Sequence, residues 1–302
     1  MLISRSEVGD ARTLPYFASR WREAIVGGRV AETPTGLPIL VDGERTLVDI
    51  STVATHVAVE RSSDSIRQLM SKIRSTSYDA SDRHAQILLE SLPRNEPLVG
   101  VVVGGGTVGP GVSRFLADDN VRLFSFDVYD SEHLTFIADG HDIPLADGVA
   151  DFVWIQAVLE HVVDPWTVAA ECQRVLRPGG IVYAETPFMQ QVHEGRYDFT
   201  RFTTLGHRML FPACDTIKLG SLDGPGVTLI WALRYFFGGL LRGRNAGRFV
   251  GLIFSWLKLF DYVIPEAHRQ MGASSSYFMG SRRAADLAPL LPREMLKEYG
   301  GV

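Results

Sequence analysis

The chain has 302 residues, of which 46% are hydrophobic and 22% charged, and this composition suits a folded globular protein with a sizeable core. A formal net charge of −5 argues against sequence-independent binding to nucleic acid, which requires a basic face. The two cysteines, Cys172 and Cys214, are too few for a disulfide framework or a zinc cluster, and we expect no metal site.

Residues 1–60 are predicted to form a small module of their own. Their first residues contain no apolar stretch of signal-peptide length, so we expect a cytoplasmic location. Asp42-Gly43 stands between two β-rich runs within residues 38–49, a pattern typical of a β-hairpin. Residues 61–92 follow with the spacing of apolar side chains that predicts helices, and with serines and aspartates suited to cap them.

From residue 98 onward, predicted strands alternate with predicted helices. Residues 98–103 (LVGVVV) are a continuous apolar run, as expected for a strand that is buried on both faces of a parallel sheet. Further strands are predicted at 121–127, 150–156, 180–187, 215–222 and 275–282. The alternation predicts an α/β fold with a doubly wound, mostly parallel sheet, which we expect to have seven strands.

Two apolar runs of sixteen residues each, 226–241 and 249–264, lie between the last two predicted strands. As helices they would be about 24 Å long, short of the roughly 30 Å of a bilayer core, and Arg234 and Lys258 interrupt them. We therefore expect an inserted helical pair over 226–264. It would serve as a cover over a ligand pocket, as a homodimer face, or as a peripheral contact with a membrane.

A glycine-rich turn follows the first strand of the alternating region. Gly104, Gly105, Gly106 and Gly109 leave the backbone bare where a cofactor would approach it, and Asp127 ends the next strand. The spacing also fits a dinucleotide fingerprint, and a carboxylate at that position holds ribose hydroxyls in either class of enzyme. The turn alone leaves open a nicotinamide oxidoreductase, a methyltransferase, and a turn that binds nothing.

Three further segments resemble class I S-adenosylmethionine-dependent methyltransferases, of the type-11-like kind found near polysaccharide or secondary-metabolite genes. The segments are ADGHDIPLADGVADFVW at 138–154, LEHVVDP at 159–165 and RVLRPGG at 174–180, and they follow the glycine turn in the family's order. The resemblance covers about residues 95–190. It implies a Rossmann-like methyltransferase fold and S-adenosyl-L-methionine as the cofactor.

The resemblance also implies roles for individual residues on the nucleoside side of the site. Gly104–Gly106 would line the methionine and ribose side of the cofactor, and Asp127 would hold the ribose diol. Asp139 would accept a hydrogen bond from the adenine amino group, with Gly140 and His141 beside the ring.

Gln156 and Ala157, just past the strand at 150–156, would face the methyl donor. One departure from the family concerns the methionine end. The family often has an acidic residue two positions before the first glycine, where this chain has Val102, so a weaker hold on the methionine amino group is expected.

The loop at 186–203 resembles the H…DY-RFT stretch of related methyltransferases, although it reads Tyr-Asp-Phe here. It leaves the carboxyl end of a strand, where open α/β sheets bind ligands. His193 and Asp198 are the predicted catalytic residues, with His193 as the leading general base, while Arg196 or Arg201 would bind an acidic acceptor. The alternatives are an idle His193 and a local ion pair between Asp198 and Arg201 that stiffens the loop.

The sequence therefore predicts an enzyme that transfers a methyl group from S-adenosylmethionine to a small-molecule acceptor, with an oxygen of a sugar or secondary metabolite as the leading choice. The alternatives are a carbon methyltransferase on a quinone or lipid, an NAD-dependent oxidoreductase, and a scaffold that binds cofactor without turnover. The methyltransferase domain is predicted at 61–302, after the module at 1–60. We expect the protein in the cytoplasm or at the membrane periphery, with no nucleic-acid partner.

Overall fold

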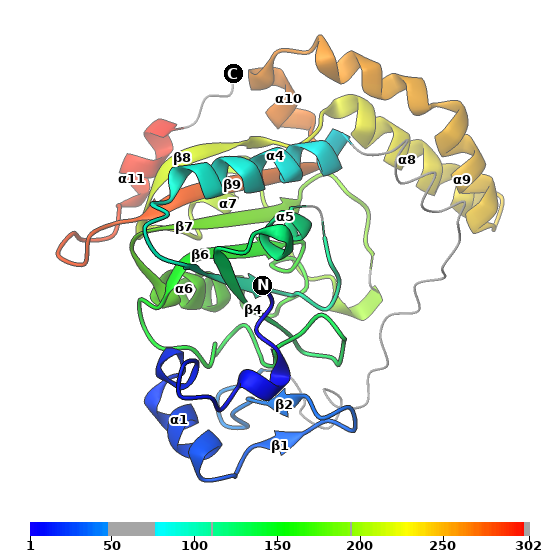
Figure 1. Ribbon diagram of the computed structural model, residues 1–302. Helices are drawn as coiled ribbons and strands as arrows, with labels where there is room; N and C mark the ends of the chain where they lie inside the picture. Colours follow the sequence, from blue (N-terminus) through cyan, green and yellow to red (C-terminus); the bar gives the residue numbers. More distant parts are fainter. Residues whose placement is uncertain (48–75, 110, 194, 299–302) are drawn as a thin grey trace.

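The computed structural model describes residues 1–47, 76–109, 111–193 and 195–298. Nine strands form a single sheet in the order β1-β2-β5-β4-β3-β6-β7-β9-β8, with helices on both faces (Figure 1). The strands are β1 (Ala31–Glu32), β2 (Pro38–Ile39), β3 (Leu98–Val103), β4 (Val121–Asp127), β5 (Phe136–Ile137), β6 (Ala150–Gln156), β7 (Leu176–Pro187), β8 (Cys214–Ser221) and β9 (Ser275–Arg282).

The centre of the sheet is parallel and buried on both faces, because its strands are continuous apolar runs. All six residues of β3 are buried, and Val101 lies opposite Phe124 of β4 on one side and Val153 of β6 on the other. β9 runs antiparallel between β7 and β8. The predicted doubly wound, mostly parallel sheet is confirmed, but it has nine strands rather than seven because two short strands extend it beyond β5.

Helices cover both faces of the sheet. Leu88 of α4 and Phe115 of α5 pack against one face, while Val168 of α6 belongs to the apolar core on the other. The helices are α1 (Ser19–Val26), α4 (Thr76–Ser91), α5 (Val112–Ala117), α6 (Pro165–Val175), α7 (Thr204–Arg208), α8 (Pro225–Leu240), α9 (Arg244–Ile253), α10 (Glu266–Gly272) and α11 (Pro292–Met295), with 3-10 turns η1 (Arg5–Glu7), η2 (Leu14–Tyr16), η3 (Gly195–Tyr197), η4 (Ser255–Tyr262) and η5 (Leu296–Glu298).

The N-terminal hairpin lies one strand earlier than predicted. β1 and β2 form it, and Gly36, with φ +80°, supplies the left-handed conformation that their turn requires. Asp42-Gly43 instead begins a turn in which the Asp42 carboxylate accepts the Glu44 amide at 3.1 Å. An Asp-Gly pair is common both in β-hairpins and in other turns. Gly43 is not among the glycines of positive φ in the described chain, so it does not adopt the conformation of a tight hairpin turn.

Residues 1–47 share the sheet and the core of the rest of the chain, in contrast to the independent module that we predicted. Ile39 of β2 pairs in parallel with Ile137 of β5, and Phe17 and Leu40 are completely buried in the same core as α6. The predicted boundary at residue 60 and the first part of the predicted helical stretch at 61–92 lie outside the described residues. Of that stretch, the structure describes α4.

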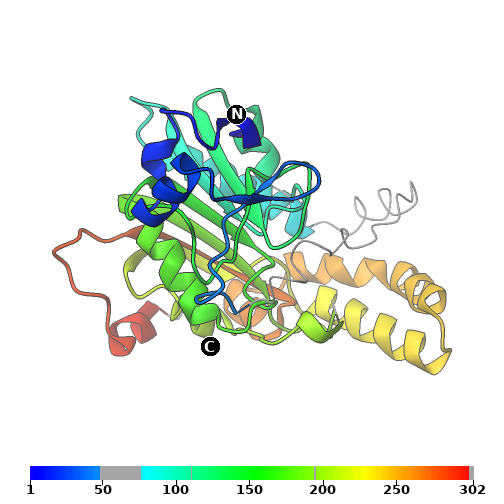
Figure 2. The same ribbon diagram turned by 90° about the horizontal axis from the view of Figure 1, so that it is seen from below.

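The helical arm, residues 225–262, comprises α8, α9 and η4 and is inserted between β8 and β9, as predicted. It projects from the body of the molecule in both views (Figures 1 and 2). The second apolar run is not one helix: it divides between α9 and η4, and Asp261 of η4 turns back to accept the Gly226 amide of α8 at 2.7 Å. In the described chain, no helix is long and apolar enough to cross a membrane.

α4 carries a buried histidine, His84, on its face toward the sheet. Its Nδ1 lies 3.2 Å from the Tyr183 hydroxyl, and its ring lies 4.1 Å, centre to centre, from that of Tyr277. Burial lowers the pKa of His84 to about 4, and the positive charges of Lys218 and Arg83 add to this effect. Folding therefore favours the neutral imidazole.

We predict that His84 destabilises the fold in acid. Between pH 6.5, near the pKa of an unfolded histidine, and pH 4, the unfolded chain binds the proton first, so the free energy of unfolding falls as pH decreases. In urea unfolding at pH 7 and pH 4, the difference between wild type and His84→Asn should shift by up to about 3 kcal/mol in favour of the variant at pH 4. A difference that stays constant with pH would contradict this role for His84.

Candidate functional site

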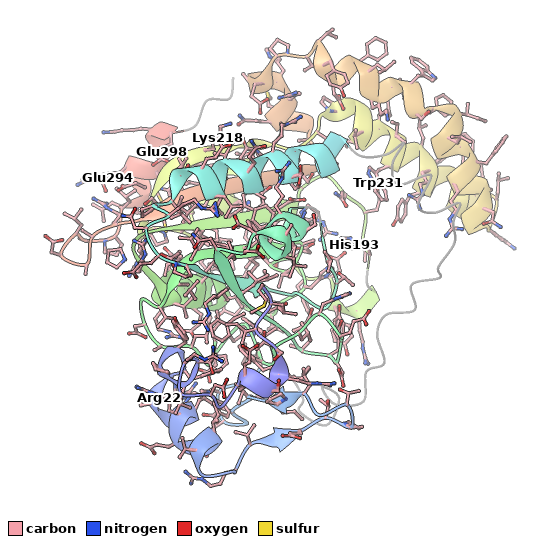
Figure 3. The ribbon with its side chains drawn as sticks, viewed as in Figure 1. Arg22, His193, Lys218, Trp231, Glu294 and Glu298 are labelled. Atoms are coloured by element: carbon pink, nitrogen blue, oxygen red, sulfur yellow. The ribbon has the colours of Figure 1, made fainter. Side chains whose placement is uncertain are left out.

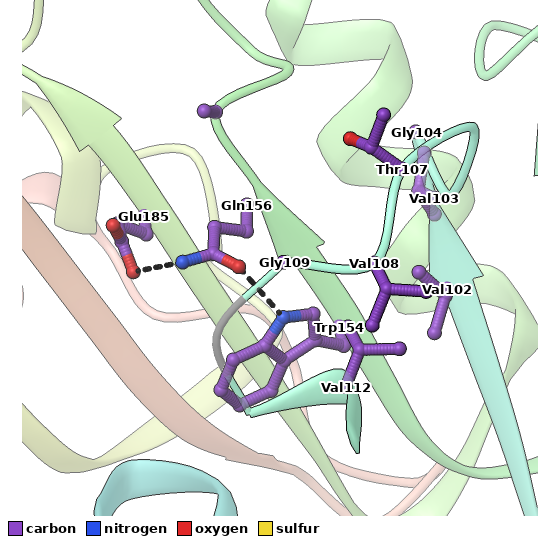
Figure 4. A pocket seen from close by; sticks show the side chains of 11 residues that line it. Val102, Val103, Gly104, Thr107, Val108, Gly109, Val112, Trp154, Gln156 and Glu185 are labelled. Atoms are coloured by element: carbon purple, nitrogen blue, oxygen red, sulfur yellow. Dashed lines mark hydrogen bonds between the residues drawn. The ribbon is translucent and has the colours of Figure 1, made fainter. Parts of the chain in front are cut away.

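A pocket opens at the point where the strand order reverses. β4 lies on one side of β3 and β6 on the other, and in such sheets ligands bind beyond the carboxyl ends of the central strands. The pocket there has a volume of about 330 Å³ and is shown in Figure 4. It is lined by Val102, Val103, Gly104, Thr107, Val108, Gly109, Val112, Trp154, Gln156, Ala157 and Glu185.

The three glycines after β3 are each required by their surroundings. Gly104 has φ +73°, and a Cβ there would lie 2.2 Å from Cγ2 of Val158. A Cβ on Gly105 would lie 2.0 Å from the Ser125 hydroxyl oxygen. A Cβ on Gly106 would lie 2.5 Å from the Tyr129 ring, so a larger residue there would displace Tyr129 as well as crowd the turn. The glycines keep the turn flat against β4.

Asp127, at the end of β4, lies beside this turn as the resemblance implies. Its Oδ2 accepts the Gly106 amide at 2.9 Å, and its Oδ1 accepts the Val128 amide at 2.7 Å. These two bonds orient the Asp127 carboxylate beside the glycine turn.

Asp139 follows β5 and is buried, with both of its oxygens already engaged. Its Oδ2 accepts from the Thr46 hydroxyl at 2.5 Å and the Leu47 amide at 3.1 Å. Its Oδ1 lies 3.0 Å from the His141 amide and 2.6 Å from the His141 Nδ1. Four donors fill the acceptor capacity of a carboxylate, so the structure ties Asp139 to the N-terminal segment, and the predicted bond to adenine stays a prediction.

Gly140 and His141 lie beside Asp139 at the same edge of the sheet. The Asp164 amide, at the start of α6, donates to Nε2 of His141 at 3.2 Å, which leaves the His141 proton on Nδ1, toward Asp139. A Cβ on Gly140 would lie 3.3 Å from Val168 of α6. These contacts fix the loop after β5, and the predicted place of Gly140 and His141 beside the adenine ring is likewise untested.

Gln156 and Ala157, the predicted neighbours of the methyl donor, both line the pocket. Ala157 has φ +54°, an uncommon conformation for a residue with a Cβ, and its amide donates to the Glu185 carbonyl at 2.9 Å. Strain of this kind concentrates at functional sites, where the surrounding structure holds it in place.

Glu185, at the end of β7, is a pocket residue that the sequence analysis missed. Its Oε2 accepts from the Ser81 hydroxyl at 2.7 Å, the Gln156 amide at 3.0 Å and the Tyr183 hydroxyl at 3.0 Å (Figure 4 draws the bond to Gln156). Burial raises the pKa of this carboxyl, against the effect of the three donors. The sequence did contain one sign of its importance, because Glu185 is the only charged residue in the apolar run 181–187.

The loop after β7 contains the predicted catalytic pair. Asp198 accepts the His193 amide at 2.7 Å and both terminal nitrogens of Arg201, one of them at 2.7 Å. The hydrogen bonds from Arg201 above all, and that from His193, lower the pKa of Asp198 to about 2. The local ion pair that the sequence left open is therefore present, and Asp198 holds the loop and the backbone of His193. Arg196 stacks on Tyr197 at 4.8 Å.

A second carboxylate, Glu160, lies behind His193 in the segment after β6. Its side chain is completely buried, and its Oε1 lies 3.6 Å from Nε2 of His161 and 3.9 Å from Nε2 of His193. Burial raises the pKa of Glu160 to about 8. The Glu160 carbonyl accepts the Phe199 amide at 2.8 Å, which joins the two loops. The motif LEHV contains Glu160, but sequence alone does not show that its carboxylate is buried.

Comparison with known proteins places the central part of the chain in a known class. The family model described as a methyltransferase domain matches residues 119–184. The dimethylglycine N-methyltransferase of Parasynechococcus marenigrum (strain WH8102) is 30% identical over 170 residues, which are 50% of this chain and 56% of the relative. The 27-O-demethylrifamycin SV methyltransferase of Amycolatopsis mediterranei (strain S699) is 32% identical over 88 residues, which are 28% of this chain and 32% of the relative.

Among solved structures, a putative sarcosine dimethylglycine methyltransferase from Galdieria sulphuraria has a TM-score of 0.44 and 18% identity, covering 67% of this chain and 84% of that protein. The geranyl diphosphate C-methyltransferase of Streptomyces coelicolor A3(2) has a TM-score of 0.44 and 13% identity, covering 66% of this chain and 78% of that protein.

The predicted resemblance to class I S-adenosylmethionine-dependent methyltransferases is confirmed over residues 119–184, which match a methyltransferase domain and lie in a Rossmann-like sheet. The match favours this class over the nicotinamide oxidoreductase that the glycine turn left open. The chain spans about half the length of the dimethylglycine enzyme and a third of the rifamycin enzyme.

Proposed function

We propose that the protein transfers a methyl group from S-adenosylmethionine to a small-molecule acceptor. The observation that carries the proposal is that the glycine turn lines the pocket at the carboxyl ends of β3 and β6 and is bonded to Asp127. The match of residues 119–184 to a methyltransferase domain supports the same function. The cofactor supplies a methyl group on a positively charged sulfur. The protein then needs to hold the two reactants in line and to exclude water.

The residues of the pocket fit the nucleoside part of this cofactor. Gly104–Gly106 leave the turn without side chains, and two backbone amides orient the Asp127 carboxylate beside it, where it would accept from the ribose hydroxyls. Gln156 and Ala157 line the same pocket, where the resemblance puts the methyl donor. Asp139, Gly140 and His141 are proposed for the adenine end, with Asp139 acting through the loop that it holds.

Glu185 fits the methionine end of the cofactor. Val102, which stands where the family often has an acidic residue, lines the pocket, and so does Glu185 from β7. The three donors on Oε2 of Glu185 oppose the effect of burial, which raises its pKa, and Oε1 accepts none of the hydrogen bonds described above. A carboxylate in this position would pair with the ammonium group of the amino acid.

We predict that Asp127 and Glu185 contact different parts of the ligand, which calorimetry with two ligands separates. Asp127→Ala should weaken both S-adenosylhomocysteine and 5′-methylthioadenosine about tenfold or more, because both contain the ribose and a charge-assisted hydrogen bond contributes about 1.5–3 kcal/mol. Glu185→Gln should weaken S-adenosylhomocysteine by a similar factor and leave 5′-methylthioadenosine, which has no ammonium group, unchanged. Glu132→Gln, whose side chain is 88% exposed, is the control.

A wild-type protein that does not bind S-adenosylhomocysteine would overturn the proposed function. Normal affinity of the Asp127→Ala variant for both ligands would instead show that the ribose lies elsewhere.

For the acceptor, we propose an oxygen of a sugar or secondary metabolite. The support is chemical: His193, His161 and Glu160 stand together at the carboxyl ends of β6 and β7, and such groups bind and deprotonate a hydroxyl. Figure 3 labels His193 on the same side of the molecule as Trp231 of α8. A carbon acceptor on a quinone or lipid is the alternative, for which the apolar helical arm is the supporting feature.

We predict that His193 acts on the acceptor and not on the cofactor. His193→Ala should reduce turnover by about 10² to 10⁴, the usual cost of losing a group that helps to deprotonate the acceptor, with S-adenosylhomocysteine affinity nearly unchanged. Asp198→Asn should have a smaller effect, because Asp198 orients the loop. Release of S-adenosylhomocysteine is measured against a panel of hydroxylated acceptors, with the exposed His268→Ala as control. Near-normal turnover of His193→Ala would remove this residue from the mechanism.

We further propose that the helical arm is a docking surface, either a homodimer face or a peripheral contact with a membrane. α8 has no buried residue although it is strongly apolar, and helices of that composition are normally covered. Phe236, Phe249 and Trp256 are 63%, 65% and 51% exposed. The third expectation, a cover over the ligand pocket, has less support because none of the residues that line the 330 Å³ pocket comes from the arm.

We predict that polar replacements on the arm alter association without altering the site. The triple variant Phe236→Ser, Phe249→Ser, Trp256→Ser should lower the mass measured by light scattering if the arm is a dimer face, or reduce co-sedimentation with anionic liposomes if it meets a membrane. Binding of S-adenosylhomocysteine should be unchanged. A triple variant that unfolds would show that the arm is part of the core, and one that matches wild type in both assays would reject the docking surface.

A further inference from the structure

Three side chains that can bind a metal converge beside the pocket. Glu160 and His161 follow β6, and His193 lies on the loop after β7, so two connections at the carboxyl edge of the sheet contribute to one cluster. One ligand atom from each of the three lies within 4.8 Å of the other two. The distances from Oε1 of Glu160 are 3.6 Å to Nε2 of His161 and 3.9 Å to Nε2 of His193.

The Glu160 carboxylate lacks the hydrogen bonds that a buried charge requires. Its side chain is 0% exposed, and neither oxygen has a hydrogen-bond partner among the described residues. The nearby guanidinium of Arg201 is held by Asp198 and by the carbonyls of Gln190, Gln191 and Thr200. A buried carboxylate without a partner costs several kcal/mol, which a bound cation would offset.

The two histidines are held in the way that metal-binding histidines usually are. Such a ring donates one N–H to a carbonyl or carboxylate and presents the other nitrogen to the metal. Nδ1 of His161 lies 2.7 Å from the Tyr197 carbonyl. Nδ1 of His193 lies 3.4 Å from the Gln191 carbonyl and 3.5 Å from the Asp198 carboxylate. In both rings Nε2 is then the atom that faces Glu160.

We propose that Glu160, His161 and His193 bind a divalent transition-metal ion. Two histidines and one carboxylate on one side of an ion suit zinc, manganese, iron or cobalt, and they leave coordination positions open. Around an ion held at about 2.1 Å, neighbouring ligand atoms are about 3.0–3.4 Å apart. Binding would therefore draw the three ligand atoms together from separations of 3.6 Å, 3.9 Å and at most 4.8 Å. The expectation of no metal site considered cysteine clusters and overlooked this set.

The role of the ion rests on the proposed function. Open coordination positions on such an ion would suit an acceptor with two neighbouring oxygens, as in a sugar diol. An oxygen bound to the ion loses its proton to water more readily. That oxygen then forms a bond to the methyl carbon as the carbon–sulfur bond breaks, and S-adenosylhomocysteine leaves. His193 would act as a ligand and not as the base.

The experiment measures metal binding by the full-length protein alone. After treatment with a chelator, the protein is titrated calorimetrically with Zn²⁺, Mn²⁺ and Co²⁺, and Co²⁺ binding is also followed by visible absorption. We expect one ion per chain in wild type and an affinity about a hundredfold lower or worse in Glu160→Gln and His193→Asn. Asp198→Asn, which alters the support of a ligand, should lose about tenfold. Glu171→Gln, on α6 where Glu171 pairs with Arg174 at 2.7 Å, and the exposed His268→Ala are matched controls.

Absence of one-to-one binding in wild type would overturn the metal site, and so would Glu160→Gln or His193→Asn variants that bind as wild type does. His193 is on a surface loop and a third exposed, so its variant is the safeguard if Glu160→Gln fails to fold. Binding of S-adenosylhomocysteine to the metal-free protein tests the proposed function separately. Metal binding without S-adenosylhomocysteine binding would sustain the site and reject the methyltransferase role, and the reverse would reject the site alone.

Discussion

The position of β3 between two parallel neighbours is the constraint on which the site depends. β3 pairs with β4 on one side and β6 on the other, and helices cover both faces of this region, so a ligand pocket forms beyond the carboxyl ends of these strands. Polar side chains that would be costly within such strands are tolerated at their ends. Asp127 and Gln156 are the last residues of β4 and β6, and Glu185 lies two residues before the end of β7, so all three stand near the carboxyl edge of the sheet.

The elements that could be predicted from the sequence are those set by local patterns. The central strands are continuous apolar runs and the glycine turn directly follows one of them, so the carboxyl edge could be located without a structure. The position of the N-terminal strands could not be. β2 is two residues long and pairs with β5 through a single pair, Ile39 and Ile137, far apart in the chain. A turn signal such as Asp42-Gly43 does not specify which partner its neighbours will find.

The same division applies to the candidate site. Asp198 and Arg201 are three residues apart, and their ion pair could be anticipated because residues at that spacing meet readily in a turn. Asp139 could be identified by motif, but its bonds to Thr46 and Leu47 join segments about ninety residues apart. Glu160 and Glu185 matter because they are buried, and burial is a property of the whole fold.

Asp198 and Glu160 are the two carboxylates close to His193, and their hydrogen bonding in the structure differs. Arg201 donates two parallel hydrogen bonds to the Asp198 carboxylate. The two residues are three positions apart on the loop, which allows both bonds to form. Glu160 stays buried, and the basic groups of the described residues that lie within 4 Å of its carboxylate are the imidazoles of His161 and His193. Neither oxygen of the Glu160 side chain has a hydrogen-bond partner among the described residues, and a cation bound beside it would balance the charge of this carboxylate. The ion pair between Asp198 and Arg201 thus explains why the Arg201 guanidinium makes no hydrogen bond to the Glu160 carboxylate among the described residues.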